Sequence, residues 1–212
     1  MSDTREIVIQ AQQDVIKAHG LCDWFEEYPW LTGFIGDIHA PVWFLAENPS
    51  LKQILKQAGN LDLNENLQWN ASPGDCLLRE AIMEANLKMG DPKKNEGWNC
   101  YISNVDKEPE IAGKRSRKAN FLNWRAEIWL PVLQKQVDLG SPKIIVTLGK
   151  NADKILRHMR GLGLRAPESE YVHHYTYIMN YPETTGKKRV QGHPERIKEF
   201  KDRIADIAKR YA

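Results

Sequence analysis

The sequence predicts an α/β fold, a three-layer αβα sandwich around a short, four-stranded, mostly parallel sheet. Two observations lead to this expectation. Short apolar runs typical of strands alternate along the chain with longer segments whose apolar residues recur at helical spacing. Strands that alternate with helices usually form parallel sheets with helices on both faces. The length of 212 residues, 42 % of them hydrophobic, fits a single domain over residues 1–212.

Four segments have the composition of buried strands. They are short, and they are enriched in the β-branched and aromatic residues that strands prefer. "KIIVTLG" is the clearest example, and "YVHHYTYI" reads as a strand or the end of one. The four segments are residues 41–46, 100–105, 143–149 and 171–178.

The segments between these strands carry helix start and stop signals. Residues 3–19 begin with a capping-box-like pair, Asp3 and Glu6, and end before Gly20. Ser and Pro at 72–73 occupy the cap and first-turn positions of another helix. The remaining expected helices are residues 51–58, roughly 120–138, "NADKILRHM" at 151–159, and a C-terminal helix with an apolar face from Ile197 to Tyr211.

Composition excludes several classes of protein. The chain has no run of 18 apolar residues, so we expect no membrane span, and its acidic, amphipathic start is unlike a signal peptide. Cys22, Cys76 and Cys100 are far apart and odd in number, which favours a reducing compartment over disulfides or a cysteine-ligated cluster. The net charge is only +2, and composition alone assigns the basic clusters at 113–118 and 186–189 to solvated loops.

Glu47 and Asn48 directly follow the first expected strand. Ligands of parallel sheets bind beyond the carboxyl ends of the strands, so these two side chains should lie at the mouth of a crevice. Pro49 fits the first turn of the next helix, where its missing N–H costs nothing. The alternative is that Asn48 only caps this helix, and the turn viewed alone favours that alternative.

Four motifs follow one another along the chain: "AENPS" (46–50), "ISNVDK" (102–107), "SPKIIVTLGKNADKIL" (141–156) and "HHYT" (173–176). In that order and at those separations, the set resembles the uracil-DNA glycosylase superfamily. Its members have a Gly-x-Asp-Pro, Gly-Glu-Ala-Pro-Gly or Gly-x-Asn-Pro-Gly turn after the first strand and an Asn at the end of the next. A Pro-Lys-x-Ile-Val-x-Leu-Gly segment and a His-Pro-Ser motif come later. No single motif is specific, but the ordered set of four is more so.

The resemblance implies an enzyme that hydrolyses the N-glycosidic bond of uracil, or of a related deaminated base, in DNA to initiate base-excision repair. Two departures motivate an alternative, a DNA- or nucleotide-binding module of the same fold with lost or altered chemistry. Ala46 replaces the leading Gly of the first motif, and Tyr175 replaces the Pro of the last. An unrelated flavodoxin-like nucleotide binder would need a glycine-rich phosphate loop, which "AENPSLK" lacks.

The resemblance also implies roles for individual residues. Asn48 falls where the families place the Asp or Asn that positions the attacking water, and a carboxamide oxygen can orient a water. Glu47 falls where one branch keeps its acid, so it would supply negative charge near the sugar cation or act as a base. Asn104 matches the Asn that reads uracil, because a carboxamide complements the N3–H and O4 pair. Trp69 is the candidate for stacking on the base.

Two histidines compete for the role of stabilising the anionic leaving base. His174 begins "HYT" and lies close to the family's usual distance beyond Gly149. His193 begins "HPE", which has the literal His-Pro, but Pro194 resembles the first turn of the final helix. We favour His174 and expect His193 to lie near a phosphate at the positive end of that helix.

DNA is the expected partner, and we expect no cofactor, no metal and no membrane association. The chain should be a monomer in the cytoplasm, or in the nucleus or nucleoid. Phosphate contacts use cations, hydroxyls and backbone N–H groups. The candidates are Ser50, Lys52, Ser72, Lys150, Tyr175, Thr176, Lys187, Lys188, Arg189 and His193.

Overall fold

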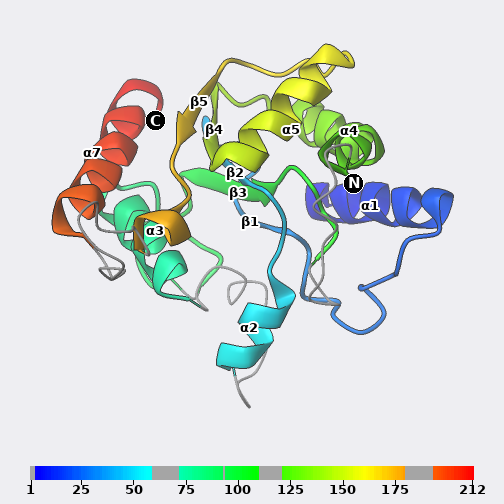
Figure 1. The fold of residues 1–212 in the computed structure, drawn as a ribbon, viewed down its shortest axis with the longest axis horizontal. Coiled ribbons are helices and arrows are strands. Elements are labelled where there is room, and N and C mark those ends of the chain that lie inside the picture. The colour runs from blue at the N-terminus through cyan, green and yellow to red at the C-terminus, as the bar shows by residue number, and fades with distance from the viewer. Residues whose placement is uncertain (1–2, 59–71, 93, 110–120, 180–192) are drawn as a thin grey trace.

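The computed structural model describes residues 3–58, 72–92, 94–109, 121–179 and 193–212. Within these residues the chain forms a mixed α/β fold of five strands and seven helices (Figure 1). None of the described helices is both long and apolar enough to cross a membrane. In chain order the elements are α1 (Thr4–His19), β1 (Phe34–Gly36), β2 (Val42–Ala46), α2 (Leu51–Ala58), α3 (Pro73–Glu84), β3 (Cys100–Asn104), α4 (Phe121–Gly140), β4 (Ile144–Leu148), α5 (Lys150–Gly161), β5 (Ser169–Val172), α6 (Tyr175–Met179) and α7 (Pro194–Tyr211).

The sheet is mostly parallel, with the strand order β1-β3-β2-β4-β5. Strand β2 lies at its centre and pairs in parallel with β3 and β4, and β4 pairs in parallel with β5. Strand β1 runs antiparallel to β3, with Phe34 opposite Ser103. The expected four-stranded sheet is therefore wrong by one strand. Strand β1 has only three residues, which is too short for a period-two pattern to identify it.

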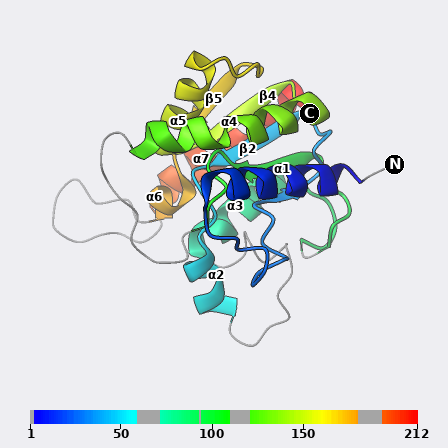
Figure 2. The same cartoon turned by 90° about the vertical axis from the view of Figure 1, so that its right-hand side faces the viewer.

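Helices cover both faces of this sheet because its strands alternate their side chains between two cores. Trp43 and Leu45 of β2 pack into one core with residues of α1, α4 and α5. Val42 and Phe44 pack into the other core with residues of α3, α6 and α7. Figure 2 shows α1 and α4 side by side over the first of these faces. Every residue of β2 and β4 is buried, as expected for central strands of a parallel sheet.

The helix caps agree with the local signals in the sequence. The side chain of Asp3 accepts a hydrogen bond from the backbone N–H of Arg5, and Gly20 ends α1 in the left-handed conformation at φ 59°. The hydroxyl of Ser72 accepts from the backbone N–H of Asp75 at 3.1 Å, which caps α3. The predicted starts of α1 and α3 are confirmed.

The segment 171–178 does not form a strand throughout, so that expectation is wrong in its second half. Strand β5 ends at Val172, and α6 begins at Tyr175. The carbonyl of His174 accepts hydrogen bonds from the N–H groups of Tyr177 and Ile178, at 2.8 and 3.1 Å. The chain therefore turns into a short helix directly beyond the carboxyl end of the sheet.

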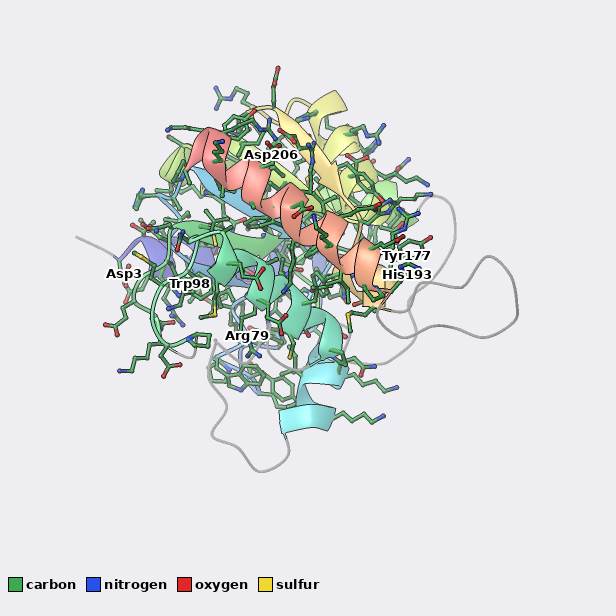
Figure 3. The ribbon with its side chains drawn as sticks, turned by 90° about the vertical axis from the view of Figure 1, so that its left-hand side faces the viewer. Asp3, Arg79, Trp98, Tyr177, His193 and Asp206 are labelled. Carbon is green, nitrogen blue, oxygen red and sulfur yellow. The ribbon has the colours of Figure 1, made fainter. Side chains whose placement is uncertain are left out.

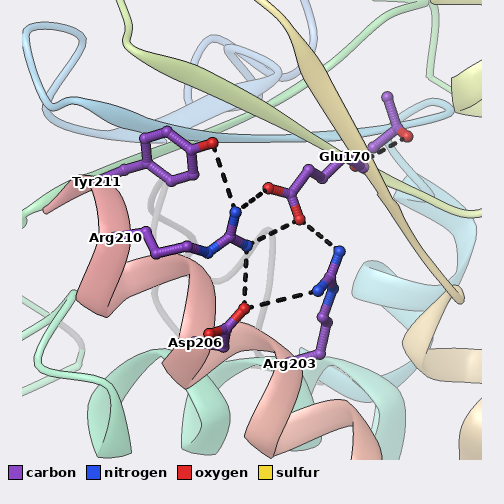
Figure 4. Close-up of polar contacts among 6 residues, drawn as sticks. Glu170, Arg203, Asp206, Arg210 and Tyr211 are labelled. Carbon is purple, nitrogen blue, oxygen red and sulfur yellow. Dashed lines mark hydrogen bonds and ion pairs between the residues drawn. The ribbon is translucent and has the colours of Figure 1, made fainter.

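An ion-pair network ties β5 to α7 (Figure 4). The carboxylate of Glu170 binds the guanidinium groups of Arg203 and Arg210, the latter at 2.7 Å. Asp206 pairs with the same Arg210 at 3.0 Å. The hydrogen bond from Arg210 is the main reason that the pKa of Glu170 lies below its ordinary value. The network holds β5, and with it the chain just before His174, against the final helix.

Candidate functional site

A cavity of about 600 Å³ lies beyond the carboxyl ends of β2, β3 and β4. Its walls come from segments that are distant in the sequence. They include the turn after β2, the end of β3, the start of α3 and the segment between β5 and α6. The structure thus brings together many of the residues that the sequence singled out. The predicted residues that line this cavity are Glu47, Asn48, Ser50, Ser72, Asn104, His174, Tyr175 and Thr176.

The turn between β2 and α2 places Asn48 at the cavity and leaves the helix cap to another residue. The carbonyl of Ser50 accepts the first helical hydrogen bonds, from Gln53 and Ile54. Asn48 is therefore not the N-cap, and Pro49 precedes α2 rather than occupying its first turn, so that expectation is wrong. The amide nitrogen of Asn48 donates to the carbonyl of Pro49 at 3.0 Å. This bond orients the side chain and leaves its oxygen as the acceptor.

Glu47 follows β2 and is held by the chain beyond β3 and by the start of α5. Its carbonyl accepts from the N–H of Asp106 at 2.9 Å, which continues the pairing of β2 and β3 past their ends. Its carboxylate accepts from the side-chain amide of Asn151, at the start of α5, at 2.9 Å. The half-buried carboxylate is thus positioned on the same wall as His174.

Asn104 ends β3, and its side chain is anchored from one side. Its amide nitrogen donates to the carbonyl of Gly33 at 3.2 Å. The hydroxyl of Ser103 donates to the same carbonyl at 3.0 Å. One N–H of the Asn104 amide is used in this way, and a carboxamide has a second N–H and an oxygen acceptor for a ligand.

Lys107 holds the backbone of Asn104 through a buried hydrogen bond, and sequence reasoning did not identify it as a site residue. Its side chain is 1 % exposed, and its ammonium donates to the hydroxyl of Ser103 at 2.8 Å and to the backbone carbonyl of Asn104. Gln136 of α4 joins this buried network by donating to the hydroxyl of Tyr101 at 2.7 Å. Burial lowers the pKa of Lys107 to about 7, although the charge of Asp106 opposes the change.

His174 has a defined tautomer when its ring is neutral. The backbone N–H of Thr176 donates to Nδ1 of His174 at 3.2 Å, so this nitrogen carries no proton. The proton of a neutral ring must then lie on Nε2, which makes Nε2–H a donor. Burial lowers the pKa of His174 below its ordinary value, opposed by the charge of Glu47, so the neutral form prevails near pH 7. A Cβ at Gly149, whose φ is 95°, would lie 2.9 Å from Cβ of His174, so a larger residue would displace this histidine.

Asp75 lines the cavity and is another residue that sequence reasoning missed. Its carboxylate accepts from the hydroxyl of Ser72 at 2.7 Å and from the side chain of Tyr175. Burial raises the pKa of Asp75 above its ordinary value and that of Tyr175 well above 10. The ring of Tyr175 lies 4.2 Å from that of His174, centroid to centroid. The start of α3 therefore braces the histidine through Tyr175, and a Cβ at Gly74 would meet the tyrosine ring at 2.8 Å.

Other predicted residues lie elsewhere. Lys52 is exposed on α2, and Lys150 lines a neighbouring cavity of about 330 Å³ that shares Glu47 and His174 with the first. His193 occupies the N-cap position of α7 and is not among the residues that line the main cavity. Figure 3 shows it at the start of that helix. Trp69 and residues 187–189 fall outside the described part of the chain.

Comparison with known proteins adds no assignment. No protein-family model matches the chain, and no curated protein is significantly similar to it in sequence. Among the described residues, no group of three or more His, Cys, Asp or Glu side chains is arranged to hold a metal ion. The chemistry of the cavity follows from its own residues, which are an anchored carboxamide, a neutral imidazole donor and an acid beside an amide.

Proposed function

We propose that this protein is a DNA glycosylase that hydrolyses the N-glycosidic bond of uracil, or of a related deaminated base, and so initiates base-excision repair. The observation that supports the proposal most is that Asn104, His174 and the Glu47–Asn48 turn share one cavity, although they follow different strands. The volume of about 600 Å³ is in the range of small-molecule sites. A base of duplex DNA would reach such a cavity only after flipping out of the helix.

The proposed reaction replaces the bond between the sugar carbon and the base nitrogen by a bond to the oxygen of water. The electron pair leaves with the base, which departs as an anion, while the sugar passes through a cation-like state. In this scheme the oxygen of Asn48 orients the water, and Glu47 supplies negative charge near the sugar and accepts the proton of the water. Nε2–H of His174 donates to the developing anion on the base oxygen, where preorganised donors have their largest effect.

Asn104 would select the base. Its free N–H and its oxygen complement the O4 and N3–H of uracil, whereas cytosine presents the opposite pattern of donor and acceptor. The hydrogen bond from Asn104 to Gly33 restricts rotation of the carboxamide, and the bonds from Lys107 hold the backbone behind it. To pair with cytosine, the carboxamide of Asn104 would have to rotate so that its N–H and its oxygen exchange places. This rotation would break the hydrogen bond to Gly33.

The arrangement of the helices also favours this proposal. The two cores place helices on both faces of the short sheet, which corresponds to the three-layer αβα sandwich that the resemblance implies. The alternative is a DNA- or nucleotide-binding module with altered chemistry. It is favoured by Ala46, whose methyl group lines the cavity where the related turns begin with Gly. The ring of Tyr175 likewise occupies space beside His174.

Incubation with an oligonucleotide that contains one uracil, followed by alkaline cleavage and gel analysis, tests the proposal. The wild-type protein should convert the strand to the cleaved product, and Asn104→Asp should lower the cleavage rate roughly 5- to 150-fold, because a buried acceptor such as O4 of uracil that loses its donor costs about 1–3 kcal/mol. The same variant should favour cytosine relative to wild type. Asn99→Asp, an exposed loop position, is the matched control and should cleave normally.

Parallel substrates with hypoxanthine, xanthine and mismatched thymine would define the range of bases. If the protein binds these DNA substrates but cleaves none of them, the result would contradict the glycosylase and support the DNA-binding module with altered chemistry. Unchanged uracil cleavage by a well-folded Asn104→Asp variant would remove Asn104 from the site.

A further inference from the structure

Three aromatic rings form a continuous exposed patch beside the candidate site. Tyr171 of β5 and Tyr177 of α6 are 36 % and 45 % exposed, and His173 lies exposed between them. The ring of His173 is 5.2 Å from that of Tyr171 and 5.5 Å from that of Tyr177, centroid to centroid. The rings of His173 and Tyr177 are tilted by 30° to each other, whereas the rings of Tyr171 and His173 meet edge to face at 76°. We call Tyr171, His173 and Tyr177 the aromatic patch.

The aromatic patch is held in place by its neighbours. The hydroxyl of Tyr171 lies 2.8 Å from Nδ1 of His173, which orients both rings. The backbone N–H of Tyr177 donates to the carbonyl of His174, which fixes the main chain that carries this ring relative to the histidine of the main cavity, and the ring itself contacts that of His173. Rings that are ordered before binding lose little conformational entropy when a flat ligand stacks on them.

Two hollows border the aromatic patch, and one of them joins it to the candidate site. All three rings line a cavity of about 330 Å³ together with Glu47 and His174. They also line a second cavity of about 420 Å³ toward the start of α7. Figure 3 shows Tyr177 at the end of the molecule where α7 begins. A flat ligand on the patch would therefore lie directly beside a nucleotide in the main cavity.

The charges around the patch suit a nucleotide better than an apolar segment of protein. Lys150 lines the smaller cavity from the first turn of α5, a 12-residue helix whose positive end faces the same hollow. Glu47 faces it too, but its carboxylate is bonded to Asn151. Glu199 lines the larger cavity and pairs with Arg196 at 2.7 Å. An aromatic surface with a cation beside it can bind a base by stacking and its phosphate by charge.

We propose that the aromatic patch is a stacking site for an unpaired nucleobase that neighbours the nucleotide in the main cavity, with Lys150 binding its phosphate. This proposal takes DNA as the ligand from the proposed function, but it requires no bond cleavage. Stacking tolerates every base because each has a π-face, so the site would hold the strand without reading its sequence.

Fluorescence anisotropy with a labelled, uracil-free single strand of about 12 nucleotides tests the stacking site. Tyr177→Ala should weaken binding roughly 5- to 150-fold, the effect of losing one base–aromatic stack. Tyr177→Phe keeps the ring and should bind as wild type, whereas Tyr177→Leu keeps only apolar volume and should resemble Tyr177→Ala. Tyr211→Ala, at the opposite end of α7, is the control and should leave binding unchanged.

Three results would overturn the stacking site. The first is unchanged binding of the single strand by Tyr177→Ala, and the second is wild-type binding by Tyr177→Leu. The third is a loss of affinity by Tyr177→Ala for a fully paired duplex of the same sequence that equals its loss for the single strand. Circular dichroism of each variant separates loss of binding from loss of fold. Because the probe holds no uracil, the result is independent of cleavage. Cleavage of uracil DNA together with unchanged binding by Tyr177→Ala would refute the stacking site alone, and binding through Tyr177 without any cleavage would refute the glycosylase alone.

Discussion

Replacement of Lys107 by Met should remove a pH dependence from the stability of the protein. The ammonium of Lys107 is buried beneath Asn104, and burial lowers its pKa from 10.5 to about 7. The unfolded chain keeps its proton up to about pH 10.5, whereas the folded protein releases it near pH 7. Between these values the unfolded state binds more protons, so the free energy of unfolding should rise with pH. Lys107→Met has no proton to release and should lack this rise.

The size of the effect follows from the two pKa values. Each tenfold change in a protonation equilibrium corresponds to about 1.4 kcal/mol, so the full difference is at most roughly 5 kcal/mol. The polar groups around Lys107 also contribute to the difference in the free energy of unfolding between the two proteins. Asp106 favours the charged ammonium, while Met would leave the hydroxyl of Ser103 and the carbonyl of Asn104 without the Lys107 donor. The stability of Lys107→Met relative to wild type should therefore be highest near pH 7 and should decrease as the pH rises.

Urea unfolding followed by tryptophan fluorescence, at pH values from about 7 to about 10.5, measures this difference. Groups that titrate in both proteins and lie outside the hydrogen-bond network of Lys107 cancel when the two curves are subtracted. Lys135→Met, an exposed position on α4, is the matched control and should track wild type. Parallel curves for wild type and Lys107→Met would show that the ammonium is not desolvated, and the explanation of its pKa would be wrong.

The remaining predictions concern catalysis and DNA binding. His174→Ala should lower single-turnover cleavage by roughly 10²–10³, as loss of one preorganised donor does, and leave DNA affinity nearly intact. His193→Ala should weaken binding modestly with little effect on cleavage at saturation, and the reverse pattern in these two variants would show that the wrong histidine was aligned. Neutralising the three cations at 187–189 should flatten the salt dependence of binding, by about one in the log–log slope for each phosphate that the protein no longer neutralises. An unchanged slope would assign that run to a solvated loop.

Local signals in the sequence predicted many elements well because their causes are local. The cap at Ser72 and the stop at Gly20 depend on hydrogen bonds within one helical turn, and the buried runs of β2 and β4 reveal central strands. Strand β1 escaped because three residues carry no period. The prediction of a strand over the second half of 171–178 was wrong, because its β-forming residues belong to a short helix. Tertiary context can thus override intrinsic propensity.

Some residues of the candidate site were likewise predicted from local signals in the sequence, and others were not. Glu47, Asn48, Asn104 and His174 were identified because polar residues at strand ends are unusual and their order resembles a known set of motifs. Asp75 was missed because an acid in the first turn of a helix has an ordinary local explanation in the helix dipole. Its proximity to Tyr175 depends on the packing of α3 against α6.

The sequence by itself determined the alternation of strands and helices, the caps and the residue types at the carboxyl ends of the strands. These depend on interactions between neighbours in the chain. Only the tertiary structure decided that Nε2 of His174 carries the proton, that Lys107 is buried beneath Asn104, and that an aromatic patch adjoins the cavity. The physical reason is that hydrogen-bond partners and desolvation come from segments far apart in sequence. A lysine or histidine has no defined proton affinity or tautomer until the fold has chosen what surrounds it.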